Sequence, residues 1–322
     1  VLFRSDLAGP EIRTGKIKDG KTELNEGSIL SIIPGDEEGD ENRIYINHPR
    51  FLDYIYPGSE IFLNDGLIQL IVEEVQEDDA KCRVATGGIL TSRKGVSLPG
   101  ARIHSVGETR KDLRDIRFAA EMGVDFIAAS FVQHANDIVR IRALLDARRS
   151  DALIIAKIES SKGVDNLEQI LNVADGIMVA RGDLGIETPA EQVPLLQKRI
   201  IKSCNEKGKI VITATEMLES MVLNPRPTRA EVTDVACAIF DGTDAVMLSA
   251  ETAIGKYPVS AVATMARIAK STEEGLDLEG MIVNKALGHT KRVADAISHA
   301  TSQTAYNLGV KAILTSTESG AT

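Results

Sequence analysis

A lysine and a glutamate, Lys157 and Glu159, stand two residues apart at the end of the apolar run 153–159. Side chains alternate along a β-strand, so these two would project from the same face. The continuous apolar run before them is typical of a strand buried on both faces of a parallel sheet. Charges carried into such a place are costly unless they are paired or bind something charged. The pair is therefore either a structural ion pair or part of a site for a charged ligand.

A second carboxylate, Asp183, follows the next apolar run along the chain. Glu159 and Asp183 together offer two oxygen ligands, which suits Mg²⁺ or Mn²⁺ completed by substrate oxygens and water. Lys157 beside such a metal would serve as a point charge for a phosphoryl group in transfer.

Backbone amides could bind an anion in the same place, in the run Ala-Arg-Gly-Asp-Leu-Gly at 180–185. Gly182 lets a ligand approach the backbone, and the short helical turn expected there points its amides at a carboxylate or phosphate oxygen. Taken alone, such a turn is equally typical of an ordinary loop. Thr215 could add a hydroxyl to the pocket, although a single threonine is more often structural.

The elements that must position these groups change in type near residue 98. Residues 12–97 show short alternating runs separated by Gly, Asp and Asn turns, which predict a small β-barrel. Strands and helices then alternate in five successive units. All five strands end in polar residues, as in a (β/α)₈ barrel, whose active site lies at the carboxyl ends of its strands. A doubly wound sheet is the alternative, but the chain lacks a Gly-rich dinucleotide turn. A polar linker beyond about 277 precedes a predicted helix at 293–307 and a predicted strand at 312–315.

Composition excludes several other classes of protein. The chain has 322 residues, 43% of them hydrophobic and 26% charged, which is ordinary for a globular protein. A net charge of −10 and the lack of a basic stripe argue against a nucleic-acid surface. No apolar run is long enough for a membrane span. The three cysteines, Cys82, Cys204 and Cys237, are odd in number and widely spaced, which favours a reduced, cytoplasmic setting.

Local structure explains part of the run 224–231 but not its two arginines. Thr228 and Glu231 form a capping box that opens a helix. Arg226 and Arg229 have no part in it, and ligand binding and surface or subunit-interface ion pairing are equally good interpretations of them.

Several motifs, taken together and in order, resemble the pyruvate kinase family. They cover essentially the whole chain: 9–15, 64–68, 155–159, 178–185, 212–218, 224–231 and 240–249. The resemblance implies a partial TIM (β/α)₈ barrel with an inserted all-β lid and the start of a C-terminal α/β domain. Residues 1–11 would end barrel strand three, 12–97 would be the lid, 98–278 the remaining barrel, and 279–322 the linker and truncated regulatory domain.

The resemblance also implies a reaction, the transfer of a phosphoryl group from phosphoenolpyruvate to ADP, which gives pyruvate and ATP. Lys157 would stabilise the transferring group, and Glu159 and Asp183 would hold Mg²⁺ or Mn²⁺. The substrate would be bound by Arg181, Gly182, Asp183 and Thr215, the last with a catalytic role as well.

Arg13 and Lys94 match family positions that contact the nucleotide phosphates when the lid closes and excludes water. Asp6 and the backbone carbonyl of Leu7 would ligate K⁺. The chain departs from the family here, because Asp6-Leu7-Ala8 stands where Asp-Thr-Lys is usual. Glu11 matches the acidic variant that accompanies K⁺ dependence.

Two barrel strands of the family have no counterpart in this sequence. We therefore expect the chain as given to be poorly folded and catalytically dead alone, while its parent would be an active homotetramer. The hydroxyl-rich run 315–322 could bind an effector phosphate or be an ordinary turn. A phosphoenolpyruvate/pyruvate-type barrel lyase or aldolase is the alternative, but it needs neither Lys157 nor the segment 12–97.

Overall fold

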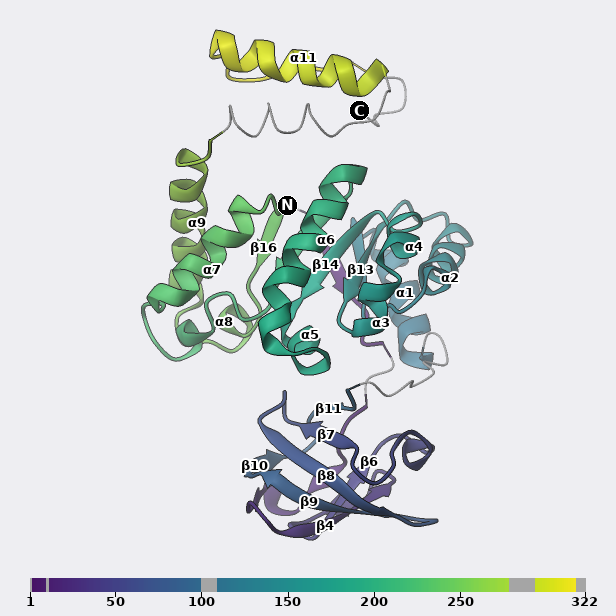
Figure 1. Ribbon diagram of the computed structural model, residues 1–322. Coiled ribbons are helices and arrows are strands. Elements are labelled where there is room, and N and C mark those ends of the chain that lie inside the picture. Colours follow the sequence, from purple (N-terminus) through teal and green to yellow (C-terminus); the bar gives the residue numbers. More distant parts are fainter. Residues whose placement is uncertain (1, 10–11, 100–108, 278–292, 317–322) are drawn as a thin grey trace. The chain divides into compact units, whose positions relative to one another are not determined.

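The computed structural model describes residues 2–9, 12–99, 109–277 and 293–316, and it divides the chain into two compact units (Figure 1). The first unit, Val1–Ile268, contains both a parallel and a largely antiparallel sheet; the second is Ala269–Thr322. Glu11 and most of the hydroxyl-rich run 315–322, from residue 317 on, lie outside the described residues.

A six-stranded parallel sheet forms the centre of the first unit. Its spatial order follows the sequence order, and every neighbouring pair is parallel. The strands are β1 (Arg4–Asp6), β12 (Phe126–Ala129), β13 (Leu153–Ile158), β14 (Gly176–Ala180), β15 (Ile210–Ala214) and β16 (Ala245–Met247). This order is that of a sheet built by repeated strand–helix units, as the alternation in the sequence predicts.

Helices connect these strands and cover one face of the sheet (Figure 1). Figure 1 shows α6 lying across β14 and α7 beside β16, and both pairs are in contact. The helices are α1 (Arg110–Met122), α2 (Ala135–Asp146), α3 (Ser161–Asp165), α4 (Leu167–Leu171), α5 (Arg181–Glu187), α6 (Val193–Lys207), α7 (Arg229–Phe240), α8 (Ala250–Ala253) and α9 (Pro258–Glu274).

The two faces of the sheet bury different amounts of apolar surface. Alternate residues such as Ile154, Ala156 and Ile177 pack with the helices in a large core. The opposite face carries a small cluster of Ala128, Ile155, Met178 and Ala214.

The sheet is curled. Arg4 Nη2 on the first strand lies 3.0 Å from the sulfur of Met247 on the last. The parallel sheet is thus a curled partial barrel.

The helix that follows residue 228 begins as the sequence predicts. The Thr228 side chain accepts from the Glu231 amide and Glu231 bonds back to the cap backbone, so the capping box is confirmed. Thr109 and Asp112 form a second box at α1, which ends at Gly123 with a φ of 63°. Glycine adopts this left-handed conformation without strain.

Between β1 and α1, residues 12–99 form a unit of β-strands and short 3-10 turns. Its main sheet has the order β11-β7-β8-β9-β4-β6 around a core of its own. The strands are β2 (Lys16–Ile17), β3 (Lys21–Leu24), β4 (Ile29–Pro34), β5 (Glu38–Gly39), β6 (Arg43–Ile46), β7 (Glu60–Leu63), β8 (Ile68–Val75), β9 (Ala80–Thr86), β10 (Gly88–Thr91) and β11 (Val96–Ser97), with short 3-10 turns η1 (Lys18–Gly20) and η2 (Phe51–Tyr54). Because β1 and β12 pair directly, this segment is inserted between adjacent strands of the parallel sheet.

The C-terminal unit corrects one prediction. Helix α11 (Val293–Leu308) is present, but residues 312–315 have no regular secondary structure, so the predicted strand there is wrong. The run 312–315 is apolar, as strands often are, but a strand also needs a paired neighbour, and none is found for it among the described residues. None of the described helices is long and apolar enough to cross a membrane.

Candidate active site

Lys157 and Glu159 lie on the same side of β13, at its carboxyl end. Lys157 Nζ is 2.8 Å from Glu159 Oε1 and donates to the Ser130 hydroxyl at 2.8 Å. The Glu159 side chain is 1% exposed and that of Lys157 17%. The other Glu159 oxygen accepts from the Phe131 amide at 2.5 Å. The shared face predicted from the two-residue spacing is confirmed.

Burial shapes the charge of Glu159. It raises the pKa of Glu159 to about 7; Lys157 opposes the shift and the negative charge of Asp183 adds to it. Asp183 also contributes to a pKa of about 7 at Glu187, which is raised mainly by burial. Nearby carboxylates make one another harder to ionise. A bound divalent cation offsets this repulsion.

The chemistry of these residues therefore fits Mg²⁺ or Mn²⁺. Two protein carboxylates suffice for such an ion when substrate and water complete its shell. Among the described residues, no group of three or more His, Cys, Asp or Glu side chains could hold a metal by itself.

Thr215 and Gly182 meet at the ends of the next two strands. The Gly182 amide donates to Thr215 Oγ1 at 2.8 Å, and that hydroxyl donates to the Ala214 carbonyl at 2.7 Å. Thr215 has a φ of 66° and Glu216 one of 53°. Left-handed backbone is strained for a β-branched residue and costs about 1–3 kcal/mol. The site thus includes a strained turn that places a hydroxyl beside an amide.

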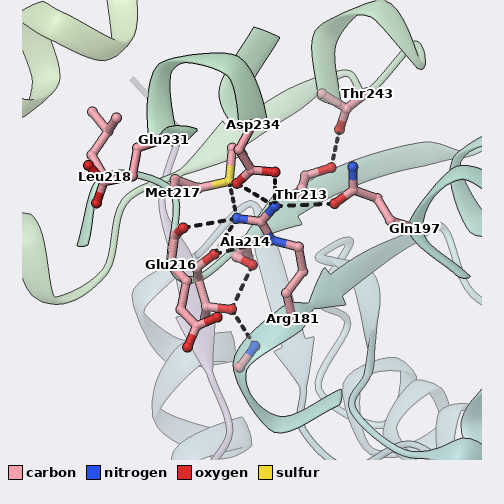
Figure 2. A network of polar contacts seen from close by, with 12 residues as sticks. Arg181, Gln197, Thr213, Ala214, Glu216, Met217, Leu218, Glu231, Asp234 and Thr243 are labelled. Atoms are coloured by element: carbon pink, nitrogen blue, oxygen red, sulfur yellow. Dashed lines mark hydrogen bonds and ion pairs between the residues drawn. The ribbon is translucent and has the colours of Figure 1, made fainter. Parts of the chain in front are cut away.

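Arg181 is turned into the protein (Figure 2). Its guanidinium donates to the carbonyl oxygens of Thr215 and Glu216 and pairs with Asp234 at 2.7 Å. The residue is 8% exposed. The substrate contact predicted for its side chain stays a prediction, but the guanidinium is engaged with protein acceptors.

Arg13 and Lys94 lie on paired segments of the inserted β unit. Arg13 forms a bridge with Gly95, its Nη1 donates to the Arg93 carbonyl at 2.7 Å, and the Lys94 amide donates to Thr14 Oγ1 at 2.9 Å. The structure therefore brings together two cations that are 81 positions apart in the sequence.

The two predicted K⁺ ligands lie at the end of β1. Asp6 Oδ2 is 2.8 Å from Arg4 Nε, and the Leu7 amide donates to the Ala128 carbonyl. Leu7 is buried. Their role toward K⁺ stays a prediction.

Comparison with known proteins decides the family. The family model described as "Pyruvate kinase, barrel domain" matches residues 1–262. The chain belongs to the pyruvate kinase family. It is 51% identical over 327 residues to a pyruvate kinase of Geobacillus stearothermophilus, with 100% of this chain and 55% of that protein covered. Identity to a Sporosarcina psychrophila pyruvate kinase is 49% (98% and 55% covered), and to one from Clostridium perfringens 47% (98% and 68% covered). The chain thus spans about half the length of the first two relatives.

Two further groups, which the sequence patterns did not predict, hold the candidate site in shape. Phe131, with a φ of 55°, directs its amide at Glu159. Fully buried Glu251 accepts from the amides of Leu218 and Ser249, at 2.9 and 2.8 Å. Glu251 follows a predicted strand end, which was a usable signal, whereas nothing local in the sequence marks Phe131.

Proposed function

We propose that this chain carries the metal- and phosphoryl-binding part of a pyruvate kinase active site. In the whole protein that site moves the phosphoryl group of phosphoenolpyruvate to ADP, giving pyruvate and ATP. The observation that carries the proposal is the Lys157–Glu159 pair at the end of β13, beside Asp183. The relatives named pyruvate kinase support it.

The roles divide by charge. Glu159 and Asp183 would hold Mg²⁺ or Mn²⁺, which when bound neutralises charge on the substrate oxygens. Lys157 presents its ammonium to the transferring group, where developing charge is stabilised most. Thr215 and the amides of Gly182 and Asp183 bind the substrate carboxylate.

The remaining roles follow from the family. Arg13 and Lys94 contact the nucleotide phosphates, and their common place on the inserted β unit supports a lid that closes over the nucleotide. Asp6 and the Leu7 carbonyl hold K⁺. The parallel sheet is part of a (β/α)₈ barrel, residues from about 279 begin a regulatory domain, and the whole protein is a cytoplasmic homotetramer.

A lyase or aldolase of the phosphoenolpyruvate/pyruvate type would also use Glu159, Asp183 and backbone amides. It has no use for a lysine ammonium 2.8 Å from the metal carboxylate, and no observation favours it.

The test compares two proteins with phosphoenolpyruvate, ADP, Mg²⁺ and K⁺. One is the 322-residue chain; the other, the extended chain, adds the remaining length of the Geobacillus stearothermophilus relative. We expect turnover by the extended chain and none by the chain alone, because two open sheet edges leave its core unfilled. A folded extended chain without phosphoryl transfer would overturn the proposal. Turnover by the 322-residue chain would overturn only its expected inactivity.

A further inference from the structure

The guanidinium of Arg181 joins four parts of the parallel-sheet unit (Figure 2). It extends from the start of α5 and reaches the turn after β15, where the Thr215 carbonyl accepts from Nε at 3.2 Å and from Nη2 at 2.8 Å. Nη2 also donates to the Glu216 carbonyl at 3.2 Å. Nη1 reaches Gln197 of α6 at 3.3 Å and Asp234 of α7 at 2.7 Å. All three nitrogens of the fork are thus engaged.

The two carbonyl groups that Arg181 binds belong to the strained turn. Thr215 and Glu216 are consecutive residues with positive φ, at 66° and 53°. Neither is glycine, and a β-branched residue is rare in that region. Such backbone persists only where the surroundings over-determine it. A planar, charged fork that binds both carbonyl oxygens supplies that constraint.

The left-handed turn sets the position of the Thr215 hydroxyl. Thr215 Oγ1 sits 2.8 Å from the Gly182 nitrogen, and Gly182 follows Arg181 directly. Two consecutive residues therefore bind Thr215. The Arg181 guanidinium binds its carbonyl group, and the Gly182 amide binds its hydroxyl.

We infer that Arg181 is a positioning residue, which holds the left-handed turn at Thr215 and Glu216 and thereby fixes the Thr215 hydroxyl against the Gly182 amide. A direct substrate contact by the guanidinium would have to break one of these bonds. The inference rests on the proposed function only for its consequence, the placement of a hydroxyl and an amide where a substrate carboxylate binds.

Hydrogen exchange of the Gly182 amide, measured at single-residue resolution by mass spectrometry on the ligand-free extended chain, tests the inference. Arg181→Lys keeps the charge but loses the fork, and Arg181→Met loses both. We expect Gly182 to exchange about tenfold faster or more in Arg181→Met and by an intermediate factor in Arg181→Lys. The matched control is Arg199→Met, an exposed arginine on α6, the helix that carries Gln197, and it should leave Gly182 unchanged.

Ile177, a residue of β14 that is paired with both neighbouring strands, separates positioning from general stability. A merely structural arginine would speed the exchange of Ile177 and Gly182 by the same factor, and that result would overturn the inference. So would unchanged Gly182 exchange in a folded Arg181→Lys chain.

A double-mutant cycle covers the case in which Arg181→Met does not fold. Thr215→Val removes the acceptor of the Gly182 amide, so Arg181→Lys should add no further acceleration in that background. Full additivity of the two changes would overturn the inference. Because exchange is measured without substrate, failure of phosphoryl transfer in the extended chain would bear on the proposed function and leave this test intact.

Discussion

Two neighbouring strands each end in a cation followed two residues later by an acid, yet the two pairs behave differently. Lys157 and Glu159 meet at 2.8 Å, whereas the Arg181 guanidinium binds the Thr215 carbonyl and pairs with Asp234. The first spacing falls at the end of a strand, where alternate residues share a face. The second falls in the first turn of α5, where residues two apart point in different directions. The same spacing therefore yields a charged site in one place and a structural tie in the other.

The two cations also differ in how fully they are compensated. Lys157 faces the Glu159 carboxylate, whose pKa is raised to about 7 by burial. The charged form of Glu159 is therefore disfavoured at the end of β13. Arg181 has acceptors for all three of its nitrogens. Lys157 contacts Ser130 and a carboxylate whose charged form burial disfavours, whereas the Arg181 guanidinium has protein acceptors on every nitrogen.

The largest expected effect comes from Lys157→Met in the extended chain. Removing the cation proposed to act on the transferring group should lower kcat by about 10²–10³-fold or more, while Mg²⁺-dependent binding of phosphoenolpyruvate survives. Steady-state kinetics and equilibrium binding measure the two quantities.

Lys202→Met, an exposed lysine of α6, is the control for Lys157→Met and should change neither quantity. If Lys157→Met weakened binding as much as turnover, the lysine would hold the ground state and the contrast with Arg181 would fail.

A pH series on the metal-free extended chain tests how strongly burial disfavours the charged form of Glu159. Its pKa is about 7 in the folded state, against an ordinary 4.5, so the folded state keeps its proton longer. Its contribution is fully present below pH 4.5, is lost as pH rises to about 7, and amounts to about 3 kcal/mol.

Urea unfolding between pH 4 and 8 should show the combined loss from Glu159 and Glu187, and Glu159→Gln should remove roughly half of that total. The other half belongs to Glu187, whose pKa is raised to about 7 by burial and by Asp183. Glu159→Gln with the same pH dependence as wild type would show that Glu159 contributes nothing to the loss between pH 4 and 8.

The Asp234 carboxylate is expected to stabilise the folded protein through its ion pair with Arg181. Replacing this carboxylate by Asn leaves the nearly buried guanidinium of Arg181 without its anion and should lower the free energy of unfolding by about 2 kcal/mol. Asp146→Asn, at the end of α2, serves as a control in the same denaturant titration. An unchanged midpoint would show that Arg181 is held by the backbone carbonyl groups alone.

Glu231→Gln should have the smallest effect, a loss of about 1 kcal/mol. Burial tends to raise the pKa of Glu231, but hydrogen bonds from Ser220 and Thr228 outweigh it, and the net shift is downward. Its contribution is therefore present above pH 4.5 and is lost as pH falls. Thermal unfolding of wild type and variant should converge in acid. A gap that stays constant with pH would mean that the carboxylate charge contributes nothing.

Sequence patterns predicted what depends on neighbours along the chain. The strand ends at Lys157 and Thr215 and the Thr228 cap follow from alternation, apolar runs and local hydrogen bonding. Sequence patterns could not predict the positive φ of Phe131 and Thr215, because those angles are set by contacts with distant residues. The direction of Arg181 was missed for the same reason, since its acceptors Gln197 and Asp234 lie on helices 16 and 53 positions away.

The left-handed backbone at Thr215 also limits which amino acids can replace it. Glycine or asparagine would relieve the strain but would remove the hydroxyl, while valine would keep the strain and lose the hydroxyl as well. Only serine retains the oxygen without branching at Cβ. At this position a more stable backbone therefore comes at the expense of the hydroxyl. Random mutagenesis selected for thermal stability alone should drift toward glycine there, away from the residue proposed to bind the substrate.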